Sequence, residues 1–375
     1  APLPAHTPRA PGTLLLLGGV PELRTLPLPA LARAYRSALG DRGRRALLDY
    51  ADPQGHPRLR AALAELVGRA RGIAASPDAI AIVRGTTHGL SLAARALCGP
   101  GDLVAVEHPG YQPAWRALEL AGATLAPIAV DRDGLDVDTL AALCATRRVR
   151  ALYLTPHHQC PTTVTLSPAR RQRLLALAEA HRIAVLEDDY DHEFHYAPRP
   201  VLPLAAADRA GVVVHLGTLS KSVAPGLRVG YVVAHPDVIR RIAAHRALCD
   251  GQGDHVHELA IALLLEDGEL HRHVRRVHRS YRARRDALAH ALHHHRLPAA
   301  RFELPRGGLA LWAQVPGVDA AAWAARGLAH GVAFQPERRF RLDDAPGDHV
   351  RLGFAACTEP ELDEAVARMA RALAG

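Results

Sequence analysis

The chain has 375 residues, of which 49% are hydrophobic, and its formal charge at neutral pH is +8. This apolar content excludes a disordered or fibrous protein, and no stretch reaches the ~18 apolar residues of a membrane-spanning helix. The arginines are scattered among acidic residues along the helices, which indicates a solvated surface and argues against a nucleic-acid-binding face.

From residue 52 onward the signals for helix and strand alternate. A helix is expected over residues 57–71, with Pro57 in its first turn and Gly72 at its end, and further helices near 90–98, 115–120, 140 and 168–181. Short apolar runs predict strands at 80–83, 103–106, 125–130, 151–154, 183–186, 212–216 and 229–233. Such strands between helices predict an α/β fold with a mostly parallel, seven-stranded type of sheet.

The last third of the chain has a different pattern. A long basic helix is expected over residues 270–295, followed by strands at 308–314 and 350–354 and helices at 321–330 and 359–373. We therefore predict a large domain over residues 46–260 and a small α+β domain over 261–375. Residues 1–45 are expected to join the small domain, and their proline-rich start, residues 1–11, suits either a natural terminus or a severed linker.

Ligands of open parallel sheets gather at the carboxyl ends of the strands, so the residues at those ends are informative. The first strand is followed by the run RGTTHG at residues 84–89, where Thr86 and Thr87 begin a helix. Free backbone N–H groups, two hydroxyls and a helix N-terminus favour binding of a phosphate. The strand at 183–186 is followed by the acidic run EDDYD at 187–191, which includes Asp188 and Tyr190.

The strand at 212–216 leads to the only lysine of the protein. Of 46 basic residues 45 are arginine, and Lys221 stands alone in the run GTLSKS at residues 217–222. A guanidinium is effectively never deprotonated and cannot attack a carbonyl, whereas a lysine amine can. Lys221 is therefore interpreted as a Schiff-base nucleophile. With an anion-binding turn and a carboxylate at neighbouring strand ends, the set matches the needs of pyridoxal 5′-phosphate, PLP.

With these motifs the sequence resembles the fold-type I PLP-dependent aminotransferases of class I/II, above all the aminotransferase-like domain of the MocR-type regulators. The most specific stretches are DYADPQGHP at 49–57, EDDYD at 187–191 and LGTLSKSVAPGLRVGY at 216–231. The resemblance covers nearly the whole chain, from LGGVP at 17–21 to the last helix, and includes no DNA-binding segment.

The resemblance implies a role for each matching residue. Lys221 would hold PLP as the internal aldimine and move the α-proton, Asp188 would pair with the pyridinium nitrogen, and Tyr190 would bond the ring hydroxyl. Phosphate contacts are implied for Thr86, Thr87, Thr218, Ser220 and Arg228. Tyr111 would stack on the ring, and Tyr50 would reach the neighbouring subunit of a homodimer. Arg351 would bind the substrate α-carboxylate, beside Gly19.

Two features depart from the common pattern. The chain has no asparagine, and it carries QCPTT at residues 159–163 where many relatives have the run NPTG. His158, Gln159 or Cys160 is expected to replace the missing asparagine at the ring hydroxyl. The 23 histidines include pairs at i, i+2, such as His255 and His257, which face different sides of a helix, so no metal site is predicted.

The sequence predicts a PLP-dependent aminotransferase that acts on an amino acid and a 2-oxo acid through a quinonoid. One alternative is a related enzyme of elimination, replacement or C–C bond formation, and another is the amino-acid-sensing effector domain of a transcription regulator. Five widely spaced cysteines without a C-x-x-C motif favour a reducing compartment, so a cytoplasmic location is expected.

Overall fold

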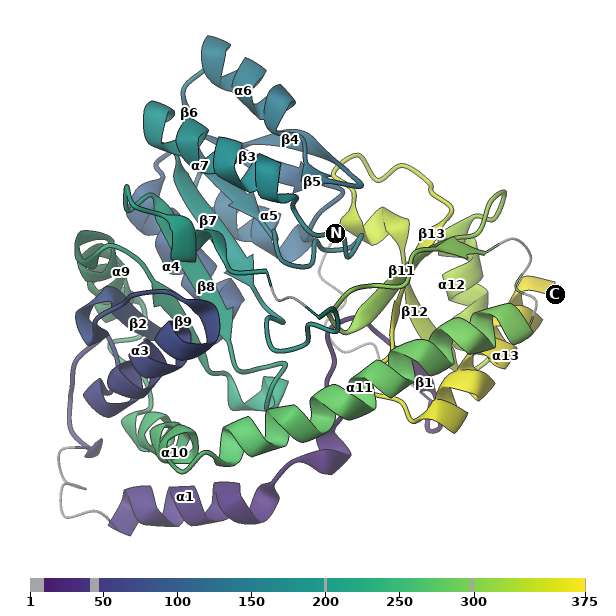
Figure 1. Ribbon diagram of the computed structural model, residues 1–375, viewed down its shortest axis with the longest axis horizontal. Helices are drawn as coiled ribbons and strands as arrows, with labels where there is room; N and C mark the ends of the chain where they lie inside the picture. Colours follow the sequence, from purple (N-terminus) through teal and green to yellow (C-terminus); the bar gives the residue numbers. More distant parts are fainter. Residues whose placement is uncertain (1–9, 41–46, 199–200, 296, 298–299, 375) are drawn as a thin grey trace.

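The computed structural model describes residues 10–40, 47–198, 201–295, 297 and 300–374. Figure 1 shows a larger part built on one sheet and a smaller part near the C-terminus, with the long helix α11 (Glu269–His294) extending along both. Most of the proline-rich start, residues 1–9, and residues 41–45 of the expected N-terminal segment lie outside the described residues. No helix in the described ranges combines the length and apolarity needed to cross a membrane.

The larger part contains an eight-stranded sheet. Its strands, in spatial order, are β2 (Ile80–Val83), β9 (Gly230–Val233), β8 (Val213–Thr218), β7 (Ala184–Asp189), β6 (Val149–Leu154), β3 (Leu103–His108), β4 (Thr124–Asp131) and β5 (Gly134–Leu135). The five strands from β8 to β4 are mutually parallel, whereas β9 and β5 run antiparallel to their neighbours. The predicted fold class is confirmed. The eighth strand, β5, was not predicted, because two residues cannot show a hydrophobic period.

Helices cover both faces of this sheet. They are α1 (Leu28–Gly40), α3 (Pro57–Arg71), α4 (Thr86–Leu97), α5 (Gln112–Leu120), α6 (Val137–Thr146), α7 (Pro168–His181), α8 (Leu204–Ala207), α9 (Pro236–Cys249) and α10 (His255–Glu266). In β3, Val104 and Val106 pack with the layer of α4, α5 and α9, whereas Leu103 and Ala105 pack with α6 and α7. Because both faces of the central strands β3, β6, β7 and β8 are buried, their sequences are mostly apolar, whereas β4 is largely exposed or half-buried.

The start of α3 shows how local chemistry sets an element boundary. Pro57 occupies the first turn, where no backbone N–H partner is needed, and His56 Nδ1 accepts the N–H of Arg58 at 3.2 Å. Gly72 ends the helix in a left-handed conformation with φ of 67°, which a glycine adopts at little cost. Both ends agree with the prediction from the sequence.

The smaller part contains a five-stranded sheet in the order β1 (Leu14–Leu16), β12 (Val332–Pro336), β13 (His349–Gly353), β11 (Ala310–Gln314) and β10 (Arg301–Phe302). Helices α11, α12 (Ala320–Ala329) and α13 (Glu359–Ala374) complete its core. The sequence predicted β11 and β13 but not β1, β10 or β12. Leu14 pairs in parallel with Val332 from the far end of the chain, a contact that leaves no local pattern.

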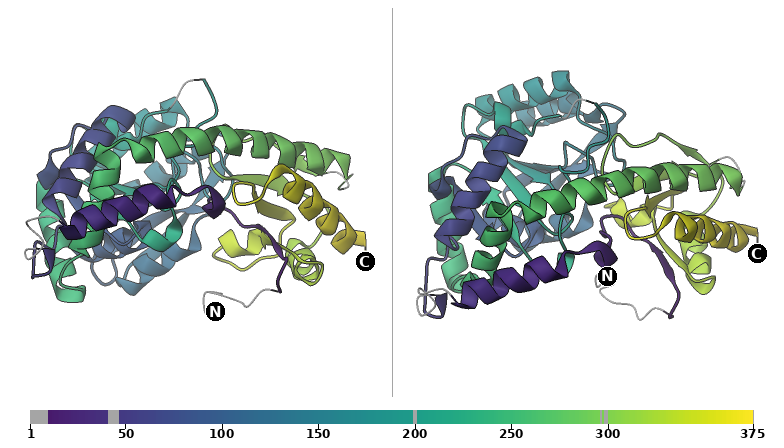
Figure 2. Two further views of the ribbon diagram at one scale, coloured as in Figure 1. Left: turned by 90° about the horizontal axis from the view of Figure 1, so that it is seen from below. Right: turned by 60° about the horizontal axis from the view of Figure 1, so that its bottom comes forward.

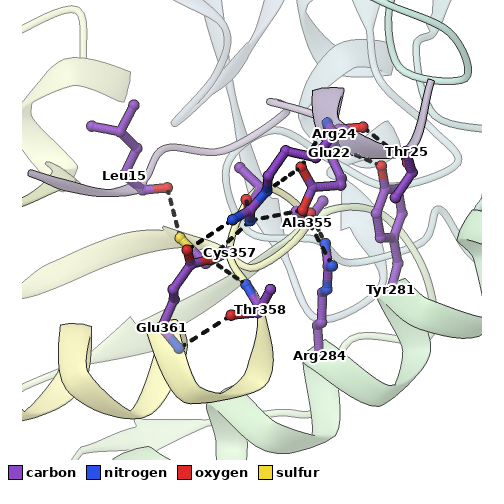
Figure 3. Close-up of polar contacts among 11 residues, drawn as sticks. Leu15, Glu22, Arg24, Thr25, Tyr281, Arg284, Ala355, Cys357, Thr358 and Glu361 are labelled. Atoms are coloured by element: carbon purple, nitrogen blue, oxygen red, sulfur yellow. Dashed lines mark hydrogen bonds and ion pairs between the residues drawn. The ribbon is translucent and has the colours of Figure 1, made fainter. Parts of the chain in front are cut away.

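After β1 the chain leaves the small sheet and passes to α1, which packs against α10 beside the large sheet (Figure 2). This passage is held by the ion-pair network of Figure 3. Buried Glu22 pairs with Arg24 at 2.8 Å and with Arg284 of α11 at 3.3 Å, and its backbone N–H donates to the Tyr281 hydroxyl at 2.8 Å. Arg24 also bonds Glu361 of α13 at 2.9 Å.

We expect Glu22→Gln to lower the free energy of unfolding by about 3 kcal/mol, because Arg284 would be left buried without its carboxylate partner. Burial raises the pKa of Glu22, but the hydrogen bonds and charge of Arg24 outweigh it and lower the pKa below its usual value. The stability that the Glu22 carboxylate contributes is therefore present near neutral pH and is lost as the pH falls through the folded-state pKa of Glu22.

Urea unfolding at pH 7 and at pH 4 measures this effect. The matched control is Glu364→Gln, which removes an exposed partner of Arg368 and should change stability by less than about 1 kcal/mol. Equal stability losses for the two variants would contradict the assigned role of Glu22.

Candidate active site

The candidate site lies where the carboxyl ends of the parallel strands meet the small sheet. Lys221 follows β8, Asp188 lies near the end of β7, and Arg351 lies on β13. Two glycines after β1 lie directly against the Lys221 and Arg351 side chains. A Cβ atom on Gly19 would lie 3.1 Å from Lys221 Nζ, and one on Gly18 would overlap the Arg351 guanidinium at 1.8 Å. The structure thus brings together residues from distant segments of the chain.

Lys221 is positioned by a turn directly after β8. Thr218 Oγ1 accepts the backbone N–H of Ser220 at 3.0 Å and lies 3.0 Å from the Ser220 hydroxyl. Burial lowers the pKa of Lys221, the positive charge of Arg351 lowers it further, and Asp191 opposes both effects. A lower pKa increases the neutral amine, which is the form that attacks a carbonyl and accepts a proton.

Asp188 presents one carboxylate oxygen to the site and holds the other in place. Its Oδ2 atom accepts a hydrogen bond from Tyr153 of β6 at 2.9 Å, whereas buried Oδ1 has no partner among the described residues. Burial raises the pKa of Asp188 to about 7; Tyr153 opposes the rise and the charge of Asp189 adds to it. A carboxylate in this setting gains most from a cationic partner at Oδ1.

A turn with the features of an anion-binding site lies at the start of α4. Gly85 precedes the helix with φ of 85°, and Thr86 and Thr87 form its first turn. Arg228 Nη2 donates to Arg84 O at 2.7 Å, and a Cβ on Gly85 would lie 2.9 Å from the same nitrogen. The guanidinium therefore lies against the N-terminal end of α4, where free N–H groups and the helix dipole both favour an anion.

Tyr190 and Arg351 form the side of the site that faces the small sheet. Tyr190 donates its hydroxyl hydrogen to His158 O at 2.9 Å, and Arg351 Nη2 lies 3.5 Å from the same hydroxyl. Arg351 is 5% exposed, and its Nε has no hydrogen-bond partner in the part of the chain described. A buried guanidinium with unused donors is suited to a carboxylate.

Tyr111 and Tyr50 have contrasting positions. Tyr111 precedes α5, and burial raises its pKa to about 12, with Asp188 adding to the rise and Thr87 opposing it. Its hydroxyl is therefore close to Thr87 at the start of α4 and to the Asp188 carboxylate. The Tyr50 side chain is 95% exposed, so within one chain it is not part of the enclosed site.

Near residues 159–163, which stand where relatives have the asparagine motif, the polar side chains bind to other protein groups. Gln159 Oε1 accepts from Thr162 N at 3.0 Å, and its Nε2 donates to Pro109 O at 2.8 Å. His158 Nδ1 lies 2.7 Å from Asp191 Oδ1, and its ring is covered by Gly307, where a Cβ would approach Nε2 to 2.1 Å. The structure thus gives both side chains other partners.

Among residues 158–160, Cys160 is the one whose side chain is surrounded by residues of the candidate site. Its thiol is 5% exposed; burial raises its pKa to about 11, Arg351 opposes the rise, and Glu107 and Asp188 add to it. Its backbone N–H donates to Thr155 Oγ1 at 2.9 Å.

Sequence reasoning missed three supporting residues. Tyr153 fixes Asp188; the signal was a single tyrosine within the aliphatic strand 149–154. Gly18 makes room for Arg351, and its N–H donates to Gln335 Oε1 at 3.1 Å. Gln335 lies on β12, a strand that was not predicted, so its position could not be inferred.

The residues present fit PLP. An unpartnered, buried carboxylate oxygen on Asp188 matches a protonated ring nitrogen, and the turn at Gly85 with Arg228 matches a phosphate. Lys221 has the amine that an aldehyde requires. Glycines at 18 and 19 leave room for the Arg351 guanidinium and the end of the Lys221 side chain, which lie directly against them.

Comparisons with known proteins agree with this geometry. Residues 18–369 match the family described as "Aminotransferase class I and II". Aromatic-amino-acid aminotransferase 1 of Thermococcus litoralis is 30% identical over 364 residues, covering 96% of this chain and 87% of that protein. The structure of LysN, the α-aminoadipate aminotransferase of Thermus thermophilus, in complex with N-(5′-phosphopyridoxyl)-L-leucine, superposes with a TM-score of 0.90 at 30% identity, covering 97% and 93% of the two chains.

A regulator is also similar. The HTH-type transcriptional regulator TauR of Rhodobacter capsulatus is 37% identical over 306 residues, which are 81% of this chain. The match spans only 62% of the regulator.

Proposed function

The chain belongs to the class I and II aminotransferase family, and on this basis we propose that it transfers the amino group of an amino acid to a 2-oxo acid, with PLP as its cofactor. The observation that carries the proposal is the convergence of Lys221, the unpartnered Oδ1 of Asp188 and the buried guanidinium of Arg351. When bound, PLP supplies an electron sink for the charge that develops at the substrate α-carbon.

Two residues act on protons. Lys221 would hold the cofactor covalently and, once released by the substrate, move the α-proton at its Nζ atom. The lowered pKa of Lys221, caused by burial and Arg351, favours the neutral amine that this role needs. Asp188 Oδ1 would hold a proton on the ring nitrogen, with Tyr153 fixing the carboxylate from the other side.

The remaining residues bind and orient. The N-terminal turn of α4 with Arg228 would hold the phosphate. Tyr111 would cover the ring. Tyr190 would turn its hydroxyl hydrogen from His158 O to the ring hydroxyl oxygen, beside the Cys160 thiol at the position of the missing asparagine. Arg351 would bind the substrate carboxylate, with Gly18 and Gly19 giving room for it.

We expect Arg351→Lys to raise the KM for the amino acid about 10- to 100-fold while kcat changes much less. A lysine keeps the charge but loses the planar pair of donors that holds a carboxylate, an effect of about 1.5–3 kcal/mol. Steady-state kinetics at saturating 2-oxo acid measure it. Arg147→Lys, at the exposed end of α6, is the matched control and should leave both constants unchanged. A fall in kcat alone would contradict carboxylate binding.

We also propose a homodimer in which Tyr50 reaches the neighbouring site. Its side chain is 95% exposed, Leu48 is 72% exposed, and Leu28 on α1 is 61% exposed, an apolar set that a second copy would cover.

Tyr50→Ala is expected to leave the dimer intact but weaken PLP binding about tenfold, because one hydrogen bond to a charged phosphate is lost. Light scattering after gel filtration measures the mass, and fluorescence titration of the apoprotein measures the affinity. Tyr50→Phe, which keeps the ring, separates the hydroxyl from packing. A monomeric wild-type protein would overturn the arrangement.

The function is tested by a panel of amino acids, with and without added 2-oxo acids. Transamination requires both partners and forms one new amino acid for each 2-oxo acid released. Release of ammonia without an acceptor would instead indicate elimination, and a product with a new carbon–carbon bond would indicate an enzyme of C–C bond formation.

We propose a cytoplasmic location, supported by five free thiols in the described chain.

The 37% identity with TauR favours a second candidate function, that of an effector-binding unit of a regulator. Binding of an amino acid with a spectral change but without turnover for any acceptor would favour this role over the enzyme.

A further inference from the structure

A buried cluster of two histidines and an aspartate lies on the opposite face of β7 from Asp188. His157 comes from the loop after β6, Asp189 ends β7, and His192 follows in the next loop. One possible ligand atom from each residue lies within 4.8 Å of the others. The three residues are 2%, 2% and 9% exposed. Successive strand residues point to opposite faces, so this cluster is separate from the site around Asp188.

The cluster contains an unusual number of unsatisfied polar atoms. Within the described residues, both ring nitrogens of His157 and Oδ1 of Asp189 have no hydrogen-bond partner, whereas His192 Nδ1 and Asp189 Oδ2 have only each other, at 3.0 Å. More than about nine in ten buried polar groups in native proteins have a partner. Three buried atoms without any partner in one place therefore indicate a bound species that belongs between them.

The position of His192 indicates that this species is positively charged. Its Nε2 lies 3.3 Å from Ala70 O, and a carbonyl oxygen can only accept, so Nε2 carries the hydrogen of the neutral ring. Nδ1 then presents a lone pair, and it lies 3.0 Å from Asp189 Oδ2, which is also an acceptor. A histidine that donates one nitrogen to a backbone carbonyl has its other nitrogen oriented as metal ligands are.

A proton and a metal ion are the two possible cations. A proton on His192 would satisfy the contact with Asp189 but would leave both nitrogens of His157 unpaired. A metal ion would take one atom from each of the three side chains. The nearby Arg71, 3.5 Å from Asp189 Oδ2, opposes a cation, but its Nη2 is paired with Glu193 at 2.5 Å.

We propose that His157, Asp189 and His192 bind a divalent cation of the zinc type, with water as the fourth ligand. Two imidazoles and a carboxylate are ligands of zinc, and ligand atoms of a tetrahedral site lie roughly 3.3 Å apart, close to the 3.0 Å between Nδ1 and Oδ2. The ion would tie the loop that carries Cys160 to the end of the strand that carries Asp188. Its role is structural, because it lies behind the strand and not in the site.

Metal analysis of the holoenzyme, prepared without a histidine tag, tests the proposal. After dialysis against EDTA, addition of zinc and gel filtration, we expect one zinc per chain. His157→Ala and His192→Ala should each bind zinc at least about tenfold more weakly. His290→Ala is the matched control, because its ring is exposed and stacks on His294 one turn away; it should retain one zinc. Loss of zinc from this control to the same extent as from His157→Ala would show surface binding only.

Cobalt(II) gives a measurement that does not depend on the variants folding. In the wild-type holoenzyme, one equivalent of cobalt should produce the intense visible absorption of a four-coordinate ion, and one equivalent of zinc should abolish it. No such absorption, together with no retained zinc, would overturn the site and would assign the cluster to a proton shared by His192 and Asp189. Neither result depends on which reaction the enzyme catalyses.

Discussion

Lys221→Arg is expected to lower kcat/KM by at least about a thousandfold, although it keeps the charge and nearly the same reach. The guanidinium cannot lose a proton at working pH, so it can neither hold the cofactor covalently nor accept the α-proton. Proton transfer by a positioned base alone contributes about 10²- to 10⁴-fold. The substitution is informative because the other 45 basic residues of the protein are already arginine.

The measurement combines kinetics with chemical labelling. Wild-type holoenzyme should show visible absorption that borohydride fixes at residue 221, and peptide mapping should locate the label. Lys221→Arg should show neither the fixed absorption nor the labelled peptide. A double variant with Lys221→Arg and Arg147→Lys restores the lysine count at the exposed residue that follows α6 and should rescue nothing. Rescue by this double variant would mean that the position of the lysine is unimportant.

Asp188→Asn is expected to lower kcat/KM by about 10²- to 10⁴-fold, which corresponds to about 3–5 kcal/mol for removing one partner of a buried charge pair. The amide has nearly the shape of the carboxylate, so packing is preserved and the loss reports the charge. Burial raises the pKa of Asp188 to about 7, so without a cationic partner at Oδ1 the carboxylate is only partly ionised at neutral pH.

Tyr153→Phe provides the graded comparison. It removes the 2.9 Å hydrogen bond to Asp188 Oδ2 but leaves the carboxylate in place, so a loss of about tenfold is expected. Kinetics and the visible absorption of each holoenzyme as a function of pH should be recorded together. If Asp188→Asn and Tyr153→Phe had equal effects, orientation rather than charge would be the contribution of Asp188.

Much of the large part was predictable because short continuous stretches of the sequence mark its strands and helices. Seven strands, their mostly parallel arrangement and the helices between them follow from apolar runs whose two faces are both buried. The anion-binding turn and the lysine turn are also short continuous motifs, and each lies at the end of a strand that the sequence predicted. Elements with few residues or distant partners, such as β1 and β5, were missed because neither length nor period marks them.

The sequence by itself determined Lys221, since one amine among 45 guanidinium groups is a chemical distinction that needs no coordinates. It could not show that Tyr153 holds Asp188, that Gly18 gives space to Arg351, or that His157 lies beside His192. Each of these pairs joins segments that are separated along the chain and meet only when the strands align or the two sheets pack together. Local residue chemistry therefore selected the reactive group, and tertiary packing decided what surrounds it.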